Sequence, residues 1–267
     1  MNDRVLLKIE NGIATVTLNR ADRHNGMDML MVRAIVKTQQ QLKKNREVRA
    51  AILCGDGPSF CAGLDVKALL DNPLTTAVGY ATLYLPRRNI FQTWGMGWRE
   101  LPFPVIAAIH GNCFGAGIQL ALGADIRIAT PDAKISIMQS KWGLVPDMGG
   151  TALLRELLPL DVVKELTFTG RILSGTQAKA LGLVTHLAED PLAQARSLIA
   201  EMLIRSPDAI AAGKFLLQEA WNTDENGALA EERRRQRQVM GGKNQRIAVE
   251  RNLKKSEKPY MRTTVRR

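Results

Sequence analysis

The spacing of apolar residues predicts a β-hairpin at the start of the chain. Apolar residues occupy every second position at Val5, Leu7 and Ile9, which is the period of a half-buried strand. The pair Asn11-Gly12 then supplies two residues that accept the positive φ angles of a tight turn. An apolar-rich run over 13–18 follows this turn. We therefore expect two short antiparallel strands.

A helical period replaces the alternation further along. Between Asp28 and Lys43 the apolar residues recur every three or four positions, which predicts an amphipathic helix. Short, fully apolar runs over 50–53 and 105–109 predict buried strands, and the spacing over 90–98 predicts a short helix. Strands and helices thus alternate in this part of the chain.

The remaining sequence predicts two more strands and then mainly helices. Residues 126–129 and 134–137 read as strands around a Pro131-Asp132 turn. The segment 71–87, with two prolines, predicts a mobile or inserted loop. From Thr151 onward nearly everything has helical spacing. Alternating strands and helices followed by a helical third indicate an α/β fold with a helical extension. Composition changes near residue 200, so we expect a core over 1–200 and a helical C-terminal region over 201–267.

Two glycine-punctuated segments are the strongest candidates for chemistry. One spans 59–67 and the other 109–122, and each joins an apolar run to a helix-compatible stretch. A chain that breaks at small residues and enters a helix leaves backbone N–H groups unpaired. Two such N–H groups that face one point would form an oxyanion hole, which stabilises negative charge on a carbonyl oxygen.

Composition narrows the class of protein. The chain has 267 residues, 45% of them hydrophobic, and no apolar run long enough to span a membrane. Its start lacks the pattern of a secretory signal, and its three cysteines lack zinc-site spacing. We expect a cytoplasmic protein with buried, reduced cysteines, no metal site and no membrane association.

Positive charge is concentrated at the C-terminal end. Residues 233–267 contain thirteen Lys or Arg and two Asp or Glu, which accounts for the whole net charge of +11. Such a tail could bind nucleic acid or a membrane surface, form a solvated helix, or attract the phosphates of an anionic ligand. Tyr260 is its only aromatic residue, and the lack of interleaved aromatic residues argues against nucleic acid.

Four ordered segments resemble the crotonase (enoyl-CoA hydratase/isomerase) superfamily. The first two, Phe60–Lys67 and His110–Gly117, resemble its paired oxyanion-hole motifs. The others, Trp142–Thr151 and Thr169–Val184, resemble the signatures that follow, so the similarity extends over about 5–255. It implies a crotonase-like spiral of ββα units with a C-terminal helical trimerisation region. It also implies homotrimers or dimers of trimers, acyl-CoA thioester substrates and no separate cofactor, because coenzyme A is part of the substrate.

The resemblance also implies roles for individual residues. The oxyanion-hole donors fall on the Leu64 and Ala116 amides, although Ala116 stands where glycine is usual. The other residues predicted to contact the substrate belong to the same segments or to places near the CoA adenine and phosphates: Arg23, His24, Ala62, Gly63, Asp65, Lys67 and Gly115. For Arg23, His24 and Lys67, plain surface charge is the open alternative.

Three further residues decide the chemistry. Hydratases of this family use two glutamates as acid and base, and Gln119 and Gln139 occupy both places. An amide takes up no proton near neutral pH, so neither glutamine can act as a general base. Asp147 is the remaining carboxylate, and the resemblance to dienoyl-CoA isomerases implies a proton-transfer role for it. The alternative is that Asp147 only caps the following helix.

These departures favour one function over another. We predict an enzyme that binds the thioester oxygen at Leu64 and Ala116, with Asp147 as the catalytic acid or base. Gln119 and Gln139 would position the acyl chain or a water. Double-bond isomerisation fits a single carboxylate better than two-glutamate hydration does. The alternative is an acyl-CoA-binding paralogue with little or no catalysis.

Overall fold

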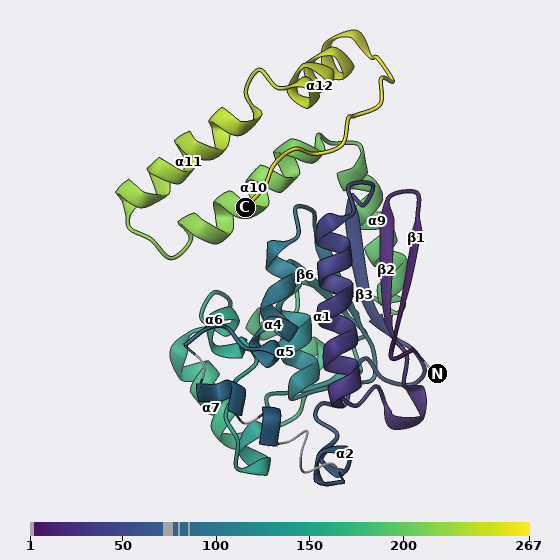
Figure 1. Cartoon of the computed structure of the whole chain (residues 1–267), viewed down its shortest axis with the longest axis vertical. Helices are drawn as coiled ribbons and strands as arrows, with labels where there is room; N and C mark the ends of the chain where they lie inside the picture. Colours follow the sequence, from purple (N-terminus) through teal and green to yellow (C-terminus); the bar gives the residue numbers. More distant parts are fainter. Residues whose placement is uncertain (1–2, 72–76, 80, 85) are drawn as a thin grey trace.

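The larger of two sheets forms the body of the protein (Figure 1). The computed structural model describes residues 3–71, 77–79, 81–84 and 86–267. The six-stranded sheet has the order β1-β2-β3-β4-β6-β9, and it is parallel except for the β1–β2 pair. Its strands are β1 (Val5–Glu10), β2 (Ile13–Leu18), β3 (Ala50–Gly55), β4 (Val105–Ile109), β6 (Ile126–Ala129) and β9 (His186–Leu187).

A smaller sheet lies beside the larger one and generates the spiral. It contains β5 (Asn112–Phe114), β7 (Lys134–Ser136) and β8 (Leu173–Ser174), in the order β5-β7-β8. The chain passes from β4 in the large sheet to β5 in the small one and then into α5 (Ala116–Leu122). β6 and β7 repeat the same step. This is the predicted crotonase-like arrangement of ββα units.

Helices cover both faces of the large sheet because its central strands are apolar on both sides. Every residue of β4 is buried. On one face, Ala51 and Leu53 of β3 belong to the cluster that includes Ile35 of α1 (Met29–Lys44). On the other face, Ile52 belongs to the cluster that includes Ile199 of α9 (Pro191–Leu203). A buried strand between two helical layers is typical of parallel sheets.

Shorter helices connect the strands. They are α2 (Val66–Leu70), η2 (Thr82–Tyr84), α4 (Ile90–Met96), η3 (Gly97–Glu100), η4 (Gln139–Trp142), α6 (Gly150–Leu154), α7 (Leu160–Thr169) and α8 (Gly175–Leu181). Within this group, Trp94 and Trp98 are completely buried. The predicted helix over 90–98 is thus an α-helix that continues as a 3₁₀ turn.

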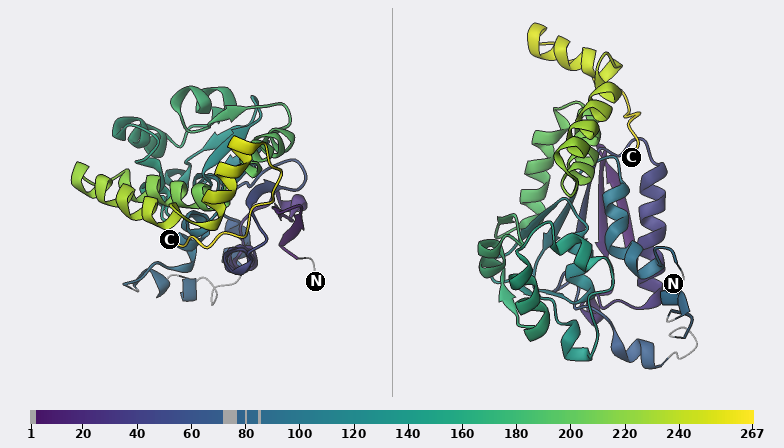
Figure 2. Two further views of the ribbon diagram at one scale, coloured as in Figure 1. Left: turned by 90° about the horizontal axis from the view of Figure 1, so that it is seen from above. Right: turned by 90° about the vertical axis from the view of Figure 1, so that its left-hand side faces the viewer.

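The C-terminal helices extend beyond the sheets (Figures 1 and 2). They are α10 (Pro207–Ala220), α11 (Glu225–Val239) and α12 (Lys243–Lys254). The last residues return along α10, where Asp208 Oδ1 accepts a hydrogen bond from the Thr264 N–H at 3.0 Å and Val265 is buried. The division at residue 200 stays a prediction, and residue 200 itself lies within α9.

Much of the basic tail is engaged within the chain. Arg235 is 1% exposed, and its guanidinium lies 5.2 Å from the centre of the Phe215 ring. Glu219 accepts hydrogen bonds from Arg234, Arg235 and Arg267. Several of the positive charges therefore hold the C-terminal helices together and are not available as a free anion-binding arm.

The hairpin, the long helix and the two strands on either side of the Pro131-Asp132 turn are confirmed. Asn11 and Gly12 have φ angles of 50° and 77° in the predicted turn. The strands β6 and β7 belong to different sheets and do not pair with each other, which the sequence left open. The short strands β5, β8 and β9 were not predicted, because two or three residues give no measurable period. Residues 72–76, 80 and 85 of the predicted loop lie outside the described residues, but Gly79 and Leu83 line a cavity.

Candidate active site

The two glycine segments lie side by side. The Cys61 N–H donates to the Asn112 carbonyl at 2.9 Å, and the Phe114 N–H donates to the Cys61 carbonyl at 3.0 Å. This single parallel bridge fixes their register. Gly117 permits the contact, since a Cβ there would lie 2.3 Å from the Cys61 carbonyl oxygen. The glycine is required by close approach of two backbones.

Leu64 also forms a parallel bridge with Met27, and this bridge orients the Leu64 N–H away from Met27. The Met27 N–H donates to the Gly63 carbonyl at 2.7 Å, and the Asp65 N–H donates to the Met27 carbonyl at 3.0 Å. In a parallel ladder alternate residues point to opposite sides, so the Leu64 N–H faces the other segment. Gly63 has a φ of +94°, and a Cβ on it would lie 3.7 Å from the Ala116 nitrogen.

Two backbone donors therefore meet at this point. Ala116 is the first residue of α5, where an N–H has no partner within the helix. Among the described residues, neither the Leu64 N–H nor the Ala116 N–H has a hydrogen-bond acceptor. The Ala116 Cβ is accommodated, since the residue is 4% exposed within the core. Such a pair of free donors can bind a carbonyl oxygen that becomes negatively charged.

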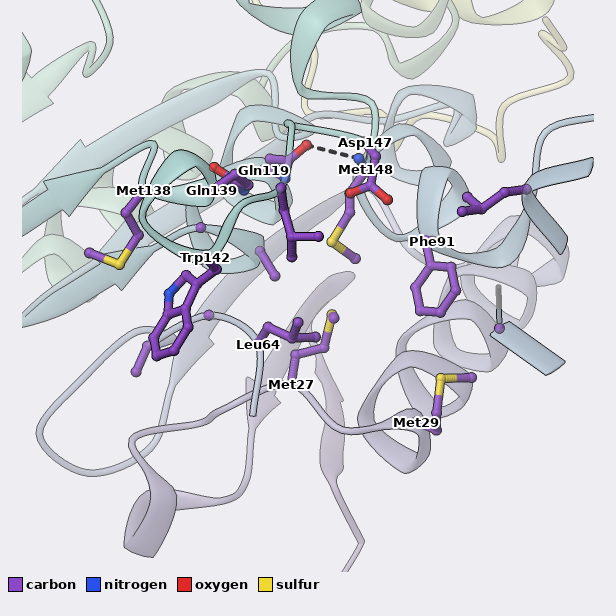
Figure 3. Close-up of a pocket in the computed structure, with 17 residues that line it drawn as sticks. Met27, Met29, Leu64, Phe91, Gln119, Met138, Gln139, Trp142, Asp147 and Met148 are labelled. Atoms are coloured by element: carbon purple, nitrogen blue, oxygen red, sulfur yellow. Dashed lines mark hydrogen bonds between the residues drawn. The ribbon is translucent and has the colours of Figure 1, made fainter. Parts of the chain in front are cut away.

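Both donors border a cavity of about 270 Å³ (Figure 3). Eight of the predicted site residues line it, together with apolar side chains. The predicted ones are Ala62, Gly63, Leu64, Gly115, Ala116, Gln119, Gln139 and Asp147. In Figure 3, Asp147 and Gln119 lie on one side of the cavity and Leu64 and Met27 on the other. Asp147 is the only carboxylate in this lining among the residues that the structure describes.

Gln119 connects α5 to the start of α6. Its Oε1 accepts hydrogen bonds from the Met148 N–H at 2.9 Å and from the Gly150 N–H at 3.1 Å. Its Nε2 has no partner within the described chain, although the side chain is 1% exposed. The side chain thus caps α6 with its oxygen and leaves an amide donor free.

Gln139 lies at the start of η4, on the wall next to Gly115. A Cβ on Gly115 would lie 3.7 Å from Gln139 Nε2. The residue is 7% exposed, and its buried Oε1 has no partner among the described residues. The second glutamine, which also lines the cavity, therefore has a buried acceptor without a partner in the described chain.

Asp147 lies at the edge of the cavity and does not cap α6. The N-cap of α6 is Gly149, without a side-chain hydrogen bond, and Gln119 serves the free N–H groups instead. The capping alternative is therefore wrong. Asp147 is exposed as a residue, but desolvation by its surroundings still raises the pKa of its carboxyl above the ordinary 3.8. The hydrogen bond to its own backbone N–H opposes this shift.

The four remaining predicted residues do not line this cavity. Arg23 and Lys67 are exposed, and exposed His24 places its Nδ1 2.9 Å from Ser59 Oγ. Asp65 contacts Arg20 Nη1 at 2.7 Å and accepts from the Ala68 N–H at 3.0 Å. Its carboxylate supports the segment that carries Leu64.

Sequence reasoning missed most of the apolar lining. The missed residues include Met27, Met29, Phe91, Met138 and Met148. Methionine at irregular spacing gives no signal that separates a binding cavity from a core. Trp142, the first residue of the third segment that resembles the family, also lines the cavity, with 55% of its surface exposed.

Other kinds of site find little support in the part of the chain that the structure describes. No group of three metal-ligating side chains is present there, and no helix there is both long and apolar enough to cross a membrane. Cys54, Cys61 and Cys113 are free and buried, as expected. Burial raises the pKa of the Cys61 thiol to about 12, so it has little thiolate character.

Known proteins identify the family. The family model for enoyl-CoA hydratase/isomerase matches residues 8–261. The chain belongs to the enoyl-CoA hydratase/isomerase family. YngF of Bacillus subtilis (strain 168) is 32% identical over 257 residues, which cover 94% of this chain and 95% of YngF. The 1,2-epoxyphenylacetyl-CoA isomerase of Escherichia coli (strain K12) is 33% identical over 230 residues, 86% of either chain.

Solved structures agree with this membership of the enoyl-CoA hydratase/isomerase family. An enoyl-CoA hydratase from Mycobacterium tuberculosis H37Rv has a TM-score of 0.85 at 28% identity, covering 98% of this chain and 100% of its own. A Thermobifida fusca YX protein solved in complex with CoA has a TM-score of 0.79 at 28% identity and covers 95% of both chains. The protein is an enzyme of this family, and an acyl-CoA thioester fits as its substrate.

Proposed function

We propose that this enzyme moves a double bond in an unsaturated acyl-CoA and does not hydrate it. The Leu64 and Ala116 N–H groups would bind the thioester oxygen, and Asp147 would transfer the proton. The proposal rests on the composition of the cavity wall. It combines two free backbone donors with one carboxylate and two glutamines.

The backbone donors make removal of a proton next to the thioester possible. When the proton leaves C2, its electron pair moves toward the thioester carbonyl, and negative charge develops on the oxygen. Two fixed N–H groups in a buried site stabilise that charge without reorganising in the reaction. The enolate is therefore the intermediate that this geometry favours.

Asp147 can then perform both proton transfers of an isomerisation. Its carboxylate takes a proton from C2 of a 3-enoyl-CoA, and the protonated acid returns it to C4 while the double bond moves to C2–C3. No atom is gained or lost. A raised pKa makes the carboxylate a stronger base, which favours the first transfer.

The glutamines argue against hydration by two carboxylates. Hydration needs a base to activate water and an acid to protonate carbon, and neither Gln119 nor Gln139 titrates near neutral pH. The same substitutions favour the second candidate function, an acyl-CoA-binding protein with little or no catalysis. Asp147 decides between the two.

Kinetics of Asp147→Asn test the proposal. Isomerisation of 3-hexenoyl-CoA and a 3,5-dienoyl-CoA is measured alongside hydration of crotonyl-CoA. We expect isomerisation by the wild type and a loss of roughly 100-fold or more in Asp147→Asn, because general acid–base catalysis contributes about this much. Asp132→Asn, in the exposed Pro131-Asp132 turn, is the matched control. Full activity of Asp147→Asn would remove Asp147 from the mechanism, and binding without turnover would favour the second candidate.

We further propose a homotrimer or a dimer of trimers in the cytoplasm, with the cationic tail near the CoA phosphates. Light scattering of the full chain tests the assembly. Calorimetry with free CoA tests the tail: substitution of exposed Lys254 and Lys255 by alanine is expected to weaken binding, and unchanged affinity would contradict this placement.

A further inference from the structure

Two residues that line the cavity each have a buried amide atom without a partner in the described chain. The atoms are Gln119 Nε2 and Gln139 Oε1, and neither has a hydrogen bond to any residue that the structure describes. The two side chains are 1% and 7% exposed, and both line the cavity. Buried polar groups are nearly always hydrogen-bonded, so two orphaned atoms on residues that line one cavity point to a polar group of the ligand.

The orientation of the Gln119 amide is fixed by its surroundings. Its oxygen accepts from two backbone N–H groups, those of Met148 and Gly150. An N–H can only donate, so the oxygen must face both of them and the NH₂ group must point elsewhere. The unpaired Gln119 Nε2 is therefore a hydrogen-bond donor, and a ligand that pairs with it must provide an acceptor.

This donor lies in surroundings that are otherwise suited to hydrocarbon. Met27, Phe91, Met138 and Met148 line the same cavity. An acyl chain made only of carbon and hydrogen would pack against these side chains but would leave the Gln119 N–H without an acceptor. A carboxylate at position 119 would present an acceptor there, and glutamine reverses that polarity.

We infer that the enzyme acts on acyl-CoA thioesters whose acyl chain carries an oxygen besides the thioester carbonyl, and that Gln119 Nε2 donates a hydrogen bond to it. The inference rests on the proposed placement of the acyl group in this cavity. A carbonyl and a hydroxyl share the acceptor that Gln119 requires. A hydroxyl also donates, and Gln139 Oε1 is free to accept from it.

Calorimetry with two pairs of non-reacting ligands tests the inference on the full-length protein. The pairs are butyryl-CoA with 3-hydroxybutyryl-CoA, and pentanoyl-CoA with 4-oxopentanoyl-CoA. We expect at least one oxygenated ligand to bind roughly 10-fold more tightly than its partner, as one buried hydrogen bond allows. Equal affinity within both pairs would overturn the inference.

Gln119→Glu separates the donor from the structural role of the side chain. A glutamate keeps an oxygen for the Met148 and Gly150 N–H groups but replaces the free donor with an acceptor. The preference for 4-oxopentanoyl-CoA over pentanoyl-CoA should disappear or reverse. Gln40→Glu, the same change on an exposed position of α1, should keep the preference of the wild type. An unchanged preference in Gln119→Glu would contradict a role for this donor.

Gln139→Met distinguishes the two oxygen sources. If the natural group is a hydroxyl, the substitution removes its acceptor and lowers the affinity for 3-hydroxybutyryl-CoA several-fold, while 4-oxopentanoyl-CoA is unaffected. If it is a carbonyl, the preference for that ligand persists in Gln139→Met. Failure of all four thioesters to bind the wild type would overturn the acyl-CoA site itself, and with it this inference.

Discussion

The backbone half and the side-chain half of the active site are built in different ways. The Leu64 and Ala116 donors are fixed by main-chain hydrogen bonds and by glycines that let two segments touch. The opposite wall carries the polar side chains of Gln119, Gln139 and Asp147. In the proposed function, the first half would hold the thioester oxygen, and the second would decide which reaction follows. A family can therefore keep one half and change its reaction through the other.

The largest expected effect comes from separating the two backbone segments. In Gly117→Ala the new Cβ would lie 2.3 Å from the Cys61 carbonyl oxygen, so the segments must move apart. We expect turnover of every acyl-CoA substrate to fall by roughly 100- to 1000-fold, the usual cost of losing one oxyanion-hole donor. Steady-state kinetics measure the loss, and circular dichroism checks the fold.

Gly213→Ala is the control for this substitution. Gly213 lies in α10, and no atom is within 4 Å of the Cβ position. Its kinetics should match those of the wild type. Equal turnover by Gly117→Ala and Gly213→Ala would show that the backbone half does not depend on this contact.

The next effect is a gain of function in the side-chain half. We expect the double substitution Gln119→Glu with Gln139→Glu to raise hydration of crotonyl-CoA by about 100-fold over the wild type, because it restores an acid and a base beside an intact pair of donors. The Met148 and Gly150 N–H groups would stabilise the carboxylate at 119. Product formation is followed by the loss of enoyl absorbance. The Gln40→Glu control should show no gain. If the double variant also shows none, positions 119 and 139 do not decide the reaction.

A smaller effect concerns the support of the backbone half. Arg20 Nη1 donates to Asp65 at 2.7 Å and to the Gly26 carbonyl at 2.9 Å, with its side chain 11% exposed. We expect Arg20→Met to lower the free energy of unfolding by about 2 kcal/mol, because it leaves a half-buried carboxylate without its cation. Urea denaturation measures this change. Arg23→Met, at an exposed neighbour, should change stability by less than about 0.5 kcal/mol, and an equal loss in both would contradict the account.

The smallest effect is a shift in the pH profile. Desolvation raises the pKa of Asp147 above 3.8, while its own backbone N–H lowers it in part. The carboxylate form is the base, so isomerisation should decline as the pH falls through this raised pKa. The midpoint of the acid limb of kcat/KM should therefore lie above 3.8. A midpoint at or below that value would assign the limb to another group.

The two halves also differ in how well the sequence predicts them. The backbone half could be located from its motifs because glycines at 63, 115 and 117 mark backbone conformations and contacts that few other residues allow. The hairpin and the alternation of strands and helices followed from apolar periods, whereas the ββα spiral was implied by the family resemblance. The β6 and β7 strands were expected to flank a turn, but their assignment to separate sheets depends on tertiary packing and leaves no local pattern.

The residues of the side-chain half could be predicted from the sequence, but their arrangement could not. The sequence identified Gln119, Gln139 and Asp147, yet it assigned a possible capping role to Asp147 that Gln119 performs. Gln119 caps N–H groups that lie 29 and 31 positions further along the chain, and no local sequence pattern predicts such a contact. The methionines of the cavity were missed because a methionine in a core and one in a pocket look alike in sequence.

A structure of the enzyme with a bound acyl-CoA is the direct test of this active site. We expect the thioester oxygen about 2.7–3.1 Å from both the Leu64 and Ala116 nitrogens. We also expect the Asp147 carboxylate within hydrogen-bond reach of the protons on C2 and C4 of the acyl chain. A thioester oxygen bound away from these two N–H groups, or an acyl chain that passes out of reach of Asp147, would contradict this expectation.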